Sequence, residues 1–290
     1  MVTAKIAAST SNLGPGFDSL GCALSLFNTY TFALSDRLEI TGCPEAYCNE
    51  NNLTVVAFRK VCDRIGKPFT GLRMTVQSEI PVSRGLGSSA AMLVAGALGA
   101  NALYGNPLTT QDLFAICTEI EGHPDNIAPM LFGGLTVAVM DGDRPRAVNC
   151  AIHPDLRFLA LIPDFPLSTK KARALLPDRV PRKDAIFNLS RAAMLPQALA
   201  SGDEALIRAA MQDRLHEPYR RSLIPGIDQL EQQALAEGAL GFCISGAGPA
   251  CLCVTKDPTL ADRLTLPEGW RVHILSPVNH GPQIKTEKPL

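Results

Sequence analysis

The sequence predicts a mixed α+β protein built from two domains. Strand-like and helical segments are interspersed along the 290 residues, without the regular alternation of a doubly wound parallel sheet. A polar stretch rich in turn residues, 141–154, divides them into two blocks, which we predict to be domains of residues 1–150 and 151–290. This length is enough to bury one or two hydrophobic cores.

Charge balance and hydropathy exclude two classes of partner. The 27 basic and 28 acidic side chains leave a formal net charge of −1, so we expect no basic surface of the kind that binds nucleic acid. The longest uncharged apolar stretch, residues 90–100, is too short to span a membrane. The first 20 residues carry one Lys and no apolar run of the signal-peptide type. We therefore expect a cytoplasmic protein with small-molecule partners.

Nine cysteines, an odd number without a Cys-x-x-Cys pair, are spread through apolar segments. This distribution is typical of reduced, buried thiols. Cys251 and Cys253 flank Leu252 in a strand-like run, so both side chains are expected on one face of the strand. We interpret them as packing residues rather than as a metal or redox site.

The N-terminal block opens with two strand-like segments, residues 3–8 and 20–34, separated by the turn-rich sequence SNLGPGFDS. Residues 53–65 have a helical pattern that ends at Gly66. Apolar and polar residues alternate over 72–76, which predicts a half-buried strand.

The segment 88–104 is rich in Ala, Leu, Val and Gly and carries no charge. A helix of this composition has to be covered on most sides, so we predict a core helix that ends at Gly105. A further helix is expected from Thr109 or Thr110 to Glu121, and a strand over 135–140.

The C-terminal block mixes strands with amphipathic helices. Its last ten residues are expected to form a frayed tail. The predicted strands are 158–162, 241–245, 251–255 and 271–274, and the predicted helices are 183–200, 204–213 and 227–237.

The strongest local signal is the loop PVSRGLGSSAA, residues 81–91, between an alternating strand and the uncharged helix. Gly85 and Gly87 allow a close backbone approach to a ligand, and Ser88 and Ser89 open the helix with hydroxyl groups. A helix N-terminus combines unpaired N–H groups with the positive end of the helix dipole. The loop therefore predicts a phosphate-binding site.

Three other interpretations of this loop are weaker. GLGSSA fits the dinucleotide fingerprint of a Rossmann oxidoreductase, but that motif needs an acidic residue about 20 positions on. Residues 85–111 contain no Asp or Glu, and no Gly-Lys-Ser/Thr sequence closes the loop as in a Walker motif. A turn that merely packs is the third interpretation.

The loop resembles the phosphate-binding motif of the GHMP kinases. The segments 11–21, 121–134, 163–177, 217–226 and 245–250 resemble, in order and spacing, the members of this family that act on homoserine. The resemblance implies a first domain like ribosomal protein S5 domain 2, a ferredoxin-like second domain and an active site between them. It also implies transfer of the γ-phosphoryl group of ATP to the side-chain hydroxyl of L-homoserine, on the route to threonine.

Two sets of nucleotide contacts follow from the resemblance. The second Gly-rich loop, SGAGPA, would pack against the phosphate loop and help to shape the nucleotide site. Asn52 is a further candidate for contact with adenine. The implied nucleotide-binding residues are Arg84, Gly85, Leu86, Gly87, Ser88, Ser89, Ala90, Gly246 and Gly248.

Oxygen ligands beside a phosphate loop suggest Mg²⁺. The hydroxyl of Ser89 and the carboxylate of Glu121 are the expected ligands, with Glu119 as the alternative. The polar sequence EGHPDN between two apolar segments has the character of a site wall.

The resemblance also implies how an amino acid would be held. Arg173 and Arg220 would bind its carboxylate, since guanidinium groups bind carboxylates through paired hydrogen bonds. Their neighbours Lys170, Lys171 and Arg221 are expected to be solvated surface cations. The implied substrate contacts are Asn12, Asp18, His123, Asp125, Arg173 and Arg220.

Phosphoryl transfer needs positioning and charge neutralisation more than covalent help. Asn12 and Asp125 are expected to orient the acceptor hydroxyl, and Asn126 stands where other GHMP kinases carry an Asp base, so the identity of a base stays open. Two further functions also stay open: a GHMP kinase for another small alcohol, and a sensor that binds the same ligands without turnover. A homodimer is compatible with the sequence, which leaves the oligomeric state open.

Overall fold

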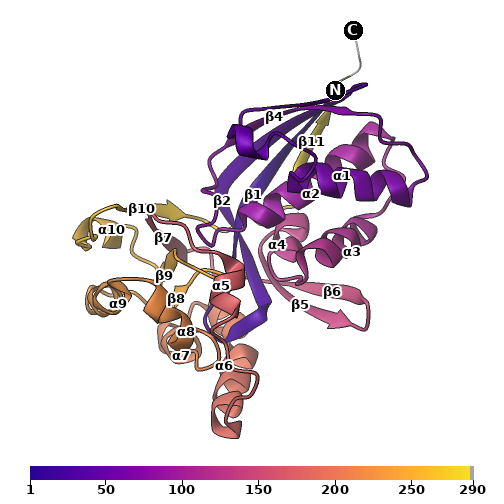
Figure 1. Ribbon diagram of the computed structural model, residues 1–290. Coiled ribbons are helices and arrows are strands. Elements are labelled where there is room, and N and C mark those ends of the chain that lie inside the picture. Colours follow the sequence, from indigo (N-terminus) through magenta and orange to yellow (C-terminus); the bar gives the residue numbers. More distant parts are fainter. Residues whose placement is uncertain (288–290) are drawn as a thin grey trace.

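The computed structural model describes residues 1–287, whose strands form two sheets (Figure 1). The larger sheet has the order β11-β1-β2-β4-β3, with β5 paired to β2 and β6 paired to β5. Its pairs are antiparallel except for β3 with β4. Its strands are β1 (Val2–Asn12), β2 (Gly16–Leu34), β3 (Leu38–Thr41), β4 (Leu72–Ser78), β5 (Leu135–Asp141), β6 (Arg144–Cys150) and β11 (Gln283–Thr286).

Four helices pack beside this sheet (Figure 1). They are α1 (Leu53–Arg64), α2 (Ser88–Leu103), α3 (Thr110–Glu121) and α4 (Ile127–Phe132). The uncharged helix α2 is buried among the others because it contains glycine where its neighbours come closest. A Cβ atom on Gly96 would lie 2.0 Å from the carbonyl oxygen of Thr54, and one on Gly99 would lie 2.6 Å from the ring of Phe32. The predicted core helix is therefore confirmed.

The smaller sheet has the antiparallel order β10-β7-β9-β8. Its strands are β7 (Arg157–Pro163), β8 (Gly241–Ile244), β9 (Cys251–Thr255) and β10 (Trp270–Leu275). Its helices are α5 (Thr169–Arg173), α6 (Arg182–Ser201), α7 (Glu204–Ala210), α8 (Glu217–Arg220), α9 (Ile227–Ala236) and α10 (Leu260–Arg263). Strand, helices, two strands, helix and strand follow one another as in ferredoxin-like domains.

One hydrophobic core runs through both sheets. It joins Leu24 of β2 to Phe158 of β7 and Leu252 of β9. A second core on the other side of the smaller sheet contains Cys251 and Cys253, as their packing role predicts. Because the main core is shared, the groove between the two parts has fixed walls.

The predicted division between the domains falls at the end of a strand. The polar stretch 141–154 contains strand β6, which pairs with β5 as a hairpin and ends at Cys150. The expectation of a frayed tail was wrong, because residues 283–286 form β11, which adds to the edge of the larger sheet through β1. Residues 283–286 thus belong to the N-terminal sheet although they lie beyond the predicted division at residue 150. The remainder of that tail, 288–290, lies outside the described residues.

None of the helices formed by residues 1–287 combines the length and the apolar character of a bilayer-spanning segment.

Candidate active site

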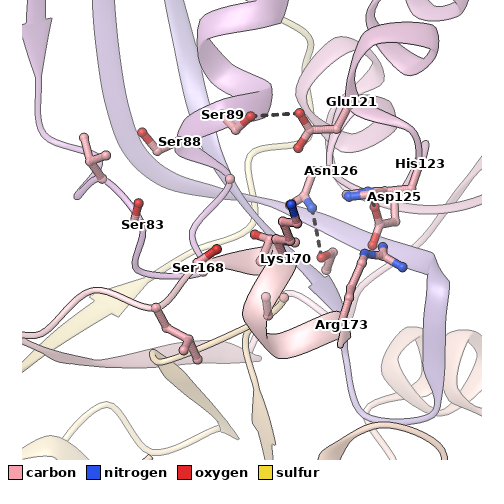
Figure 2. Close-up of a pocket in the computed structure, with 18 of the residues that line it drawn as sticks. Ser83, Ser88, Ser89, Glu121, His123, Asp125, Asn126, Ser168, Lys170 and Arg173 are labelled. Atoms are coloured by element: carbon pink, nitrogen blue, oxygen red, sulfur yellow. Dashed lines mark hydrogen bonds and ion pairs between the residues drawn. The ribbon is translucent and has the colours of Figure 1, made fainter. Parts of the chain in front are cut away.

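A cavity of about 380 Å³ lies between the two parts of the chain. Residues from the end of β1, the start of α2, the end of α3 and helix α5 meet around it (Figure 2). Most of the site residues expected from the sequence line it. They are Asn12, Asp18, Gly85, Gly87, Ser88, Ser89, Glu121, His123, Asp125, Asn126, Arg173, Arg220 and Gly246.

Helix α2 begins at the cavity wall, with Gly87 as its N-cap residue and no side chain bonded to its first turn. Gly85 and Gly87 have φ angles of +79° and +73°, in the region that favours glycine. A Cβ atom on Gly85 would lie 2.3 Å from the carbonyl oxygen of Ser245. The first turn thus brings uncapped N–H groups and the positive end of the helix dipole to the cavity.

Replacing Gly87 with Ala is expected to raise the KM for ATP on the order of a hundredfold, the loss of one or two hydrogen bonds to a charged group. The new Cβ atom would lie 2.3 Å from the Ser9 hydroxyl and 2.6 Å from Met130, so the loop has to shift. Gly105→Ala is the matched control, since Gly105 also has a positive φ but a Cβ atom there would have no neighbour within 4 Å. Steady-state kinetics in ATP check this, and equal KM values for both variants would contradict it.

Ser89 and Glu121 face each other at the inner end of the cavity (Figure 2). The Ser89 hydroxyl donates to Oε2 of Glu121 at 2.8 Å. Burial raises the pKa of Glu121, and the hydrogen bond from Ser89 offsets this only in part. Glu119 lies on the outside of α3, where its carboxylate accepts from Lys60 at 2.7 Å. In the part of the chain that the structure describes, Glu121 lines the cavity and Glu119 does not.

A group of opposite charges occupies the other end of the cavity. Arg173 donates to both carboxylate oxygens of Asp18, at 2.9 and 2.5 Å. Nδ1 of His123 lies 2.5 Å from Oδ1 of Asp125. One ligand atom each of Asp18, His123 and Asp125 lies within 4.8 Å of the other two. This end can therefore bind a group that carries both a positive and a negative charge.

Opposing influences act on His123. Burial lowers the pKa of its imidazole, but the hydrogen bond to Asp125 and the charges of Asp125 and Glu121 raise it. The net effect is a raised pKa, which favours the imidazolium form beside Asp125.

The carboxamides of Asn12 and Asn126 are held on both sides. Nδ2 of Asn12 donates to the carbonyl oxygen of Gly246 at 2.8 Å, and its Oδ1 accepts from the backbone N–H of Asp18 at 3.0 Å. Oδ1 of Asn126 accepts from Ser9 at 2.8 Å, and its Nδ2 donates to Ser11 at 3.0 Å. Both side chains therefore fix the wall of the cavity, and Asn126 has no basic atom for proton transfer.

The turn from Asn12 to Asp18 is tighter than the sequence suggests. β1 runs to Asn12 and β2 begins at Gly16, so the expected SNLGPGFDS loop is mostly strand. Asn12, Leu13 and Asp18 all have positive φ angles, of 72°, 47° and 55°. This backbone places Asp18 against the cavity, where it meets Arg173.

Four residues of the expected nucleotide site do not line the cavity: Arg84, Leu86, Ala90 and Gly248. Leu86 and Ala90 are buried in the hydrophobic core. The Arg84 guanidinium turns away from the cavity and donates to the carbonyl oxygens of Val82, Pro163 and Asp164. Arg84 thereby ties the loop to strand β7 and does not face a bound phosphate.

Sequence reasoning missed several lining residues. Lys170, expected to be a solvated surface cation, is exposed but lines the cavity beside Ser168 (Figure 2). The hydroxyl-rich sequence Ser168-Thr169 before a lysine was the available signal, and Ser83 of the loop likewise carries a hydroxyl into the lining. Asn52 caps helix α1 through Thr54 and donates to the carbonyl oxygen of Tyr47 at 2.9 Å. Asn52 also lines a smaller cavity that shares Tyr47, Val82 and Ser88 with the main one, so its contact with adenine stays a prediction.

Helix α8 carries a buried carboxyl group behind the cavity. Burial raises the pKa of Glu217 from 4.5 to about 8, and its Oε1 accepts from the backbone N–H of Ile244 at 2.9 Å. Because the folded-state pKa lies above the unfolded one, the stability that Glu217 contributes is full below pH 4.5 and is lost as the pH rises to about 8.

The variant Glu217→Gln is therefore expected to gain stability relative to the unchanged chain as the pH rises, because glutamine stays neutral. Thermal melts at about pH 5 and about pH 8 measure this, and the difference in Tm should be larger at the higher pH. A difference in Tm that does not change with pH would contradict the buried, proton-holding carboxyl group.

Comparisons with known proteins find similar sequences for both parts of the chain. The family model for the GHMP kinases N terminal domain matches residues 52–134, and the model for the GHMP kinases C terminal domain matches residues 195–266. A homoserine kinase from Clostridium botulinum is 43% identical over 89% of this chain and 87% of its own length. A homoserine kinase from Synechococcus is 41% identical over 99% of this chain and 98% of its own length.

A solved structure is similar over the same extent. The crystal structure of homoserine kinase from Cytophaga hutchinsonii has a TM-score of 0.86 with this chain at 29% sequence identity. The superposition covers 98% of this chain and 97% of that one. At this coverage the similarity in fold includes the strands of both sheets.

Proposed function

The chain belongs to the GHMP kinase family, and the relatives described above are homoserine kinases; we propose that it phosphorylates the side-chain hydroxyl of L-homoserine with ATP. The product is O-phospho-L-homoserine, a precursor of threonine. The observation that carries the proposal is that one cavity is lined by an uncapped helix N-terminus at one end and by the Asp18–Arg173 pair at the other.

The triphosphate of ATP fits the start of α2. Its negative charge is complementary to the unpaired N–H groups and the helix dipole beyond Gly87. A smaller, largely apolar cavity of about 100 Å³ adjoins this point and shares Tyr47, Val82, Ser88 and Met92 with the main one. An adenine ring fits such a cavity, because its faces are apolar and its edges polar.

The residues present also fit Mg²⁺. Ser89 and Glu121 offer two oxygen donors close together at the end of α2, the type of ligand that Mg²⁺ prefers. A bound Mg²⁺ would neutralise charge on the β- and γ-phosphates during transfer. We assign its two protein ligands to Ser89 and Glu121, and Glu119 to the salt bridge with Lys60.

The amino-acid end suits a zwitterion. Asp18 carries the charge that binds an ammonium group, and Arg173 and Arg220 carry the charges that bind a carboxylate. With the two ends of homoserine held there, its hydroxyl extends toward the phosphate loop. A neutral alcohol or sugar has no group that complements these charges.

The chain's own residues mainly position the reactants. Asn12 holds Asp18 in place, and Asp125 orients the acceptor hydroxyl. The bond between the γ-phosphorus and the bridging oxygen breaks as the hydroxyl oxygen bonds to phosphorus, so that ADP leaves and the hydroxyl proton passes to an oxygen of the transferred phosphoryl group and then to water. The α2 amides stabilise the charge that develops on the phosphoryl oxygens. Since no step needs a strong base, the hydrogen-bonded carboxamide of Asn126 serves as a structural support.

The free thiols and the kinase relatives support a cytoplasmic site of action. All nine cysteines lie free of disulfides in the structure, as expected in a reducing compartment.

The experiment that tests the function measures ADP release with a panel of acceptors at fixed MgATP: homoserine, threonine, serine, mevalonate, shikimate and galactose. We expect strong turnover of homoserine and little of the alcohols that carry no ammonium group. Turnover of one of those alcohols with homoserine inert would overturn the substrate and leave the fold unaffected. Binding of ATP and homoserine without release of ADP would indicate a sensor.

A further inference from the structure

Behind the amino-acid end of the cavity lies a fully buried histidine that no step described so far uses. His216 precedes helix α8, and its side chain is 0% exposed. It touches the two segments that carry the charges for the substrate: the turn after β1, and Arg220 one helical turn further along α8.

The two contacts fix the protonation state of the ring. Nε2 of His216 lies 2.8 Å from the carbonyl oxygen of Gly14, which can only accept a hydrogen bond. Nδ1 lies 3.2 Å from Nη1 of Arg220, which can only donate one. Both bonds form only when the proton is on Nε2 and Nδ1 is bare. Burial lowers the pKa of His216, and the negative charge of Asp213 offsets this only in part. The lowered pKa favours the neutral form of the ring.

The same contacts decide where the Arg220 guanidinium points. Its Nη1 donates to His216 and also to the carbonyl oxygen of Gly246 at 3.0 Å. That carbonyl accepts from Asn12 as well, so the ring, the guanidinium and the turn form one connected network. Arg220 itself is only 1% exposed but lines the cavity, so a small rotation would withdraw its charge from the substrate.

Phe17 completes the arrangement from the side of the turn. Its ring stacks on His216, with centroids 5.2 Å apart and an angle of 24° between the planes. The guanidinium carbons of Arg220 and Arg173 lie 5.2 and 5.5 Å from the centre of the Phe17 ring. One aromatic ring therefore contacts both arginines, whose like charges it helps to accommodate side by side.

We propose that His216 is a positioning residue for the amino-acid substrate. As a neutral Nε2–H imidazole it holds Arg220 at a fixed distance from the Asn12–Asp18 turn, so that the carboxylate and the ammonium group of the substrate can be bound at the same time. This inference rests on the proposed function for the identity of the substrate. The protonation state of His216 does not depend on that identity.

Two variants separate the contacts. The variant His216→Asn keeps an acceptor near the place of Nδ1, but its side chain is too short to reach Gly14. The variant His216→Gln reaches Gly14 but leaves Nη1 of Arg220 without its acceptor. We expect His216→Gln to raise the KM for homoserine about tenfold or more, the effect of one charge-assisted hydrogen bond. We expect His216→Asn to restore most of this, and both variants to keep the KM for ATP within about twofold. Glu217→Gln is the control, because the Glu217 side chain follows His216 directly but accepts from the backbone N–H of Ile244 rather than bonding to His216 or Arg220.

If His216 had a purely structural role, both variants would have a lower Tm, and the KM for homoserine would not rise selectively in His216→Gln. Equal effects of His216→Asn and His216→Gln, or a KM for ATP that rises together with that for homoserine, would overturn the proposal.

The unchanged chain offers a second test through the ¹⁵N chemical shifts of its histidine side chains. We expect His216 to be the neutral Nε2–H tautomer near neutral pH, and an Nδ1–H or doubly protonated ring would overturn the proposal even if the variants failed to fold. If the unchanged chain does not turn over homoserine but shows the expected tautomer, the substrate assignment fails and the network stands.

Discussion

Replacing Glu121 with glutamine is expected to lower kcat/KM about a thousandfold, which corresponds to about 4 kcal/mol of lost transition-state stabilisation. The substitution keeps the size of the side chain and its contact with Ser89 but removes the charge that binds Mg²⁺. Steady-state kinetics over a range of Mg²⁺ concentrations measure the effect. Part of the activity should return at high Mg²⁺, because one ligand and the phosphates remain.

The matched control is Glu119→Gln, the same change two residues earlier on the same helix. Its carboxylate is exposed and pairs with Lys60, and an exposed pair of this kind contributes little energy. We expect its kcat/KM to stay within about twofold of the unchanged chain. If Glu119→Gln proves the more damaging of the two, the assignment of the metal ligand is wrong.

Replacing Arg173 with glutamine is expected to raise the KM for homoserine about a hundredfold, since a paired guanidinium–carboxylate contact is among the strongest in proteins. The KM for ATP should change little, because Arg173 lies at the amino-acid end of the cavity. Lys171→Gln, on the exposed side of the same short helix, serves as the control.

An analogue without the carboxylate, 3-aminopropan-1-ol, tells recognition from damage. If Arg173 acts on the substrate carboxylate, the variant and the unchanged chain should use this analogue equally poorly. A variant that loses activity on the analogue to the same degree as on homoserine would show that Arg173 supports the cavity rather than the carboxylate.

Features encoded within short stretches of sequence were predictable. The glycine-rich loop beside the cavity, the uncharged helix after it and the glycines that shape it follow from residue types over residues 81–104. Residue type alone does not show whether Glu119 or Glu121 is the metal ligand. The two side chains point to opposite sides of helix α3, because they are two positions apart. Only the direction in which α3 packs shows which side faces the cavity.

Features that depend on distant pairs were not predictable. Asp18 and Arg173 are 155 positions apart, and His216 meets Gly14 across 202 positions. Neither contact has a local pattern. Strand β11 has only four residues and becomes a strand because β1 offers a free edge, so tertiary context decides its structure.

The most direct test of the account is a crystal structure of the chain with a non-hydrolysable ATP analogue, Mg²⁺ and L-homoserine. We predict triphosphate oxygens within hydrogen-bond distance of the backbone N–H groups at the start of α2, and an amino acid whose ammonium and carboxylate groups meet Asp18 and Arg173. A triphosphate bound away from that helix end would contradict the account.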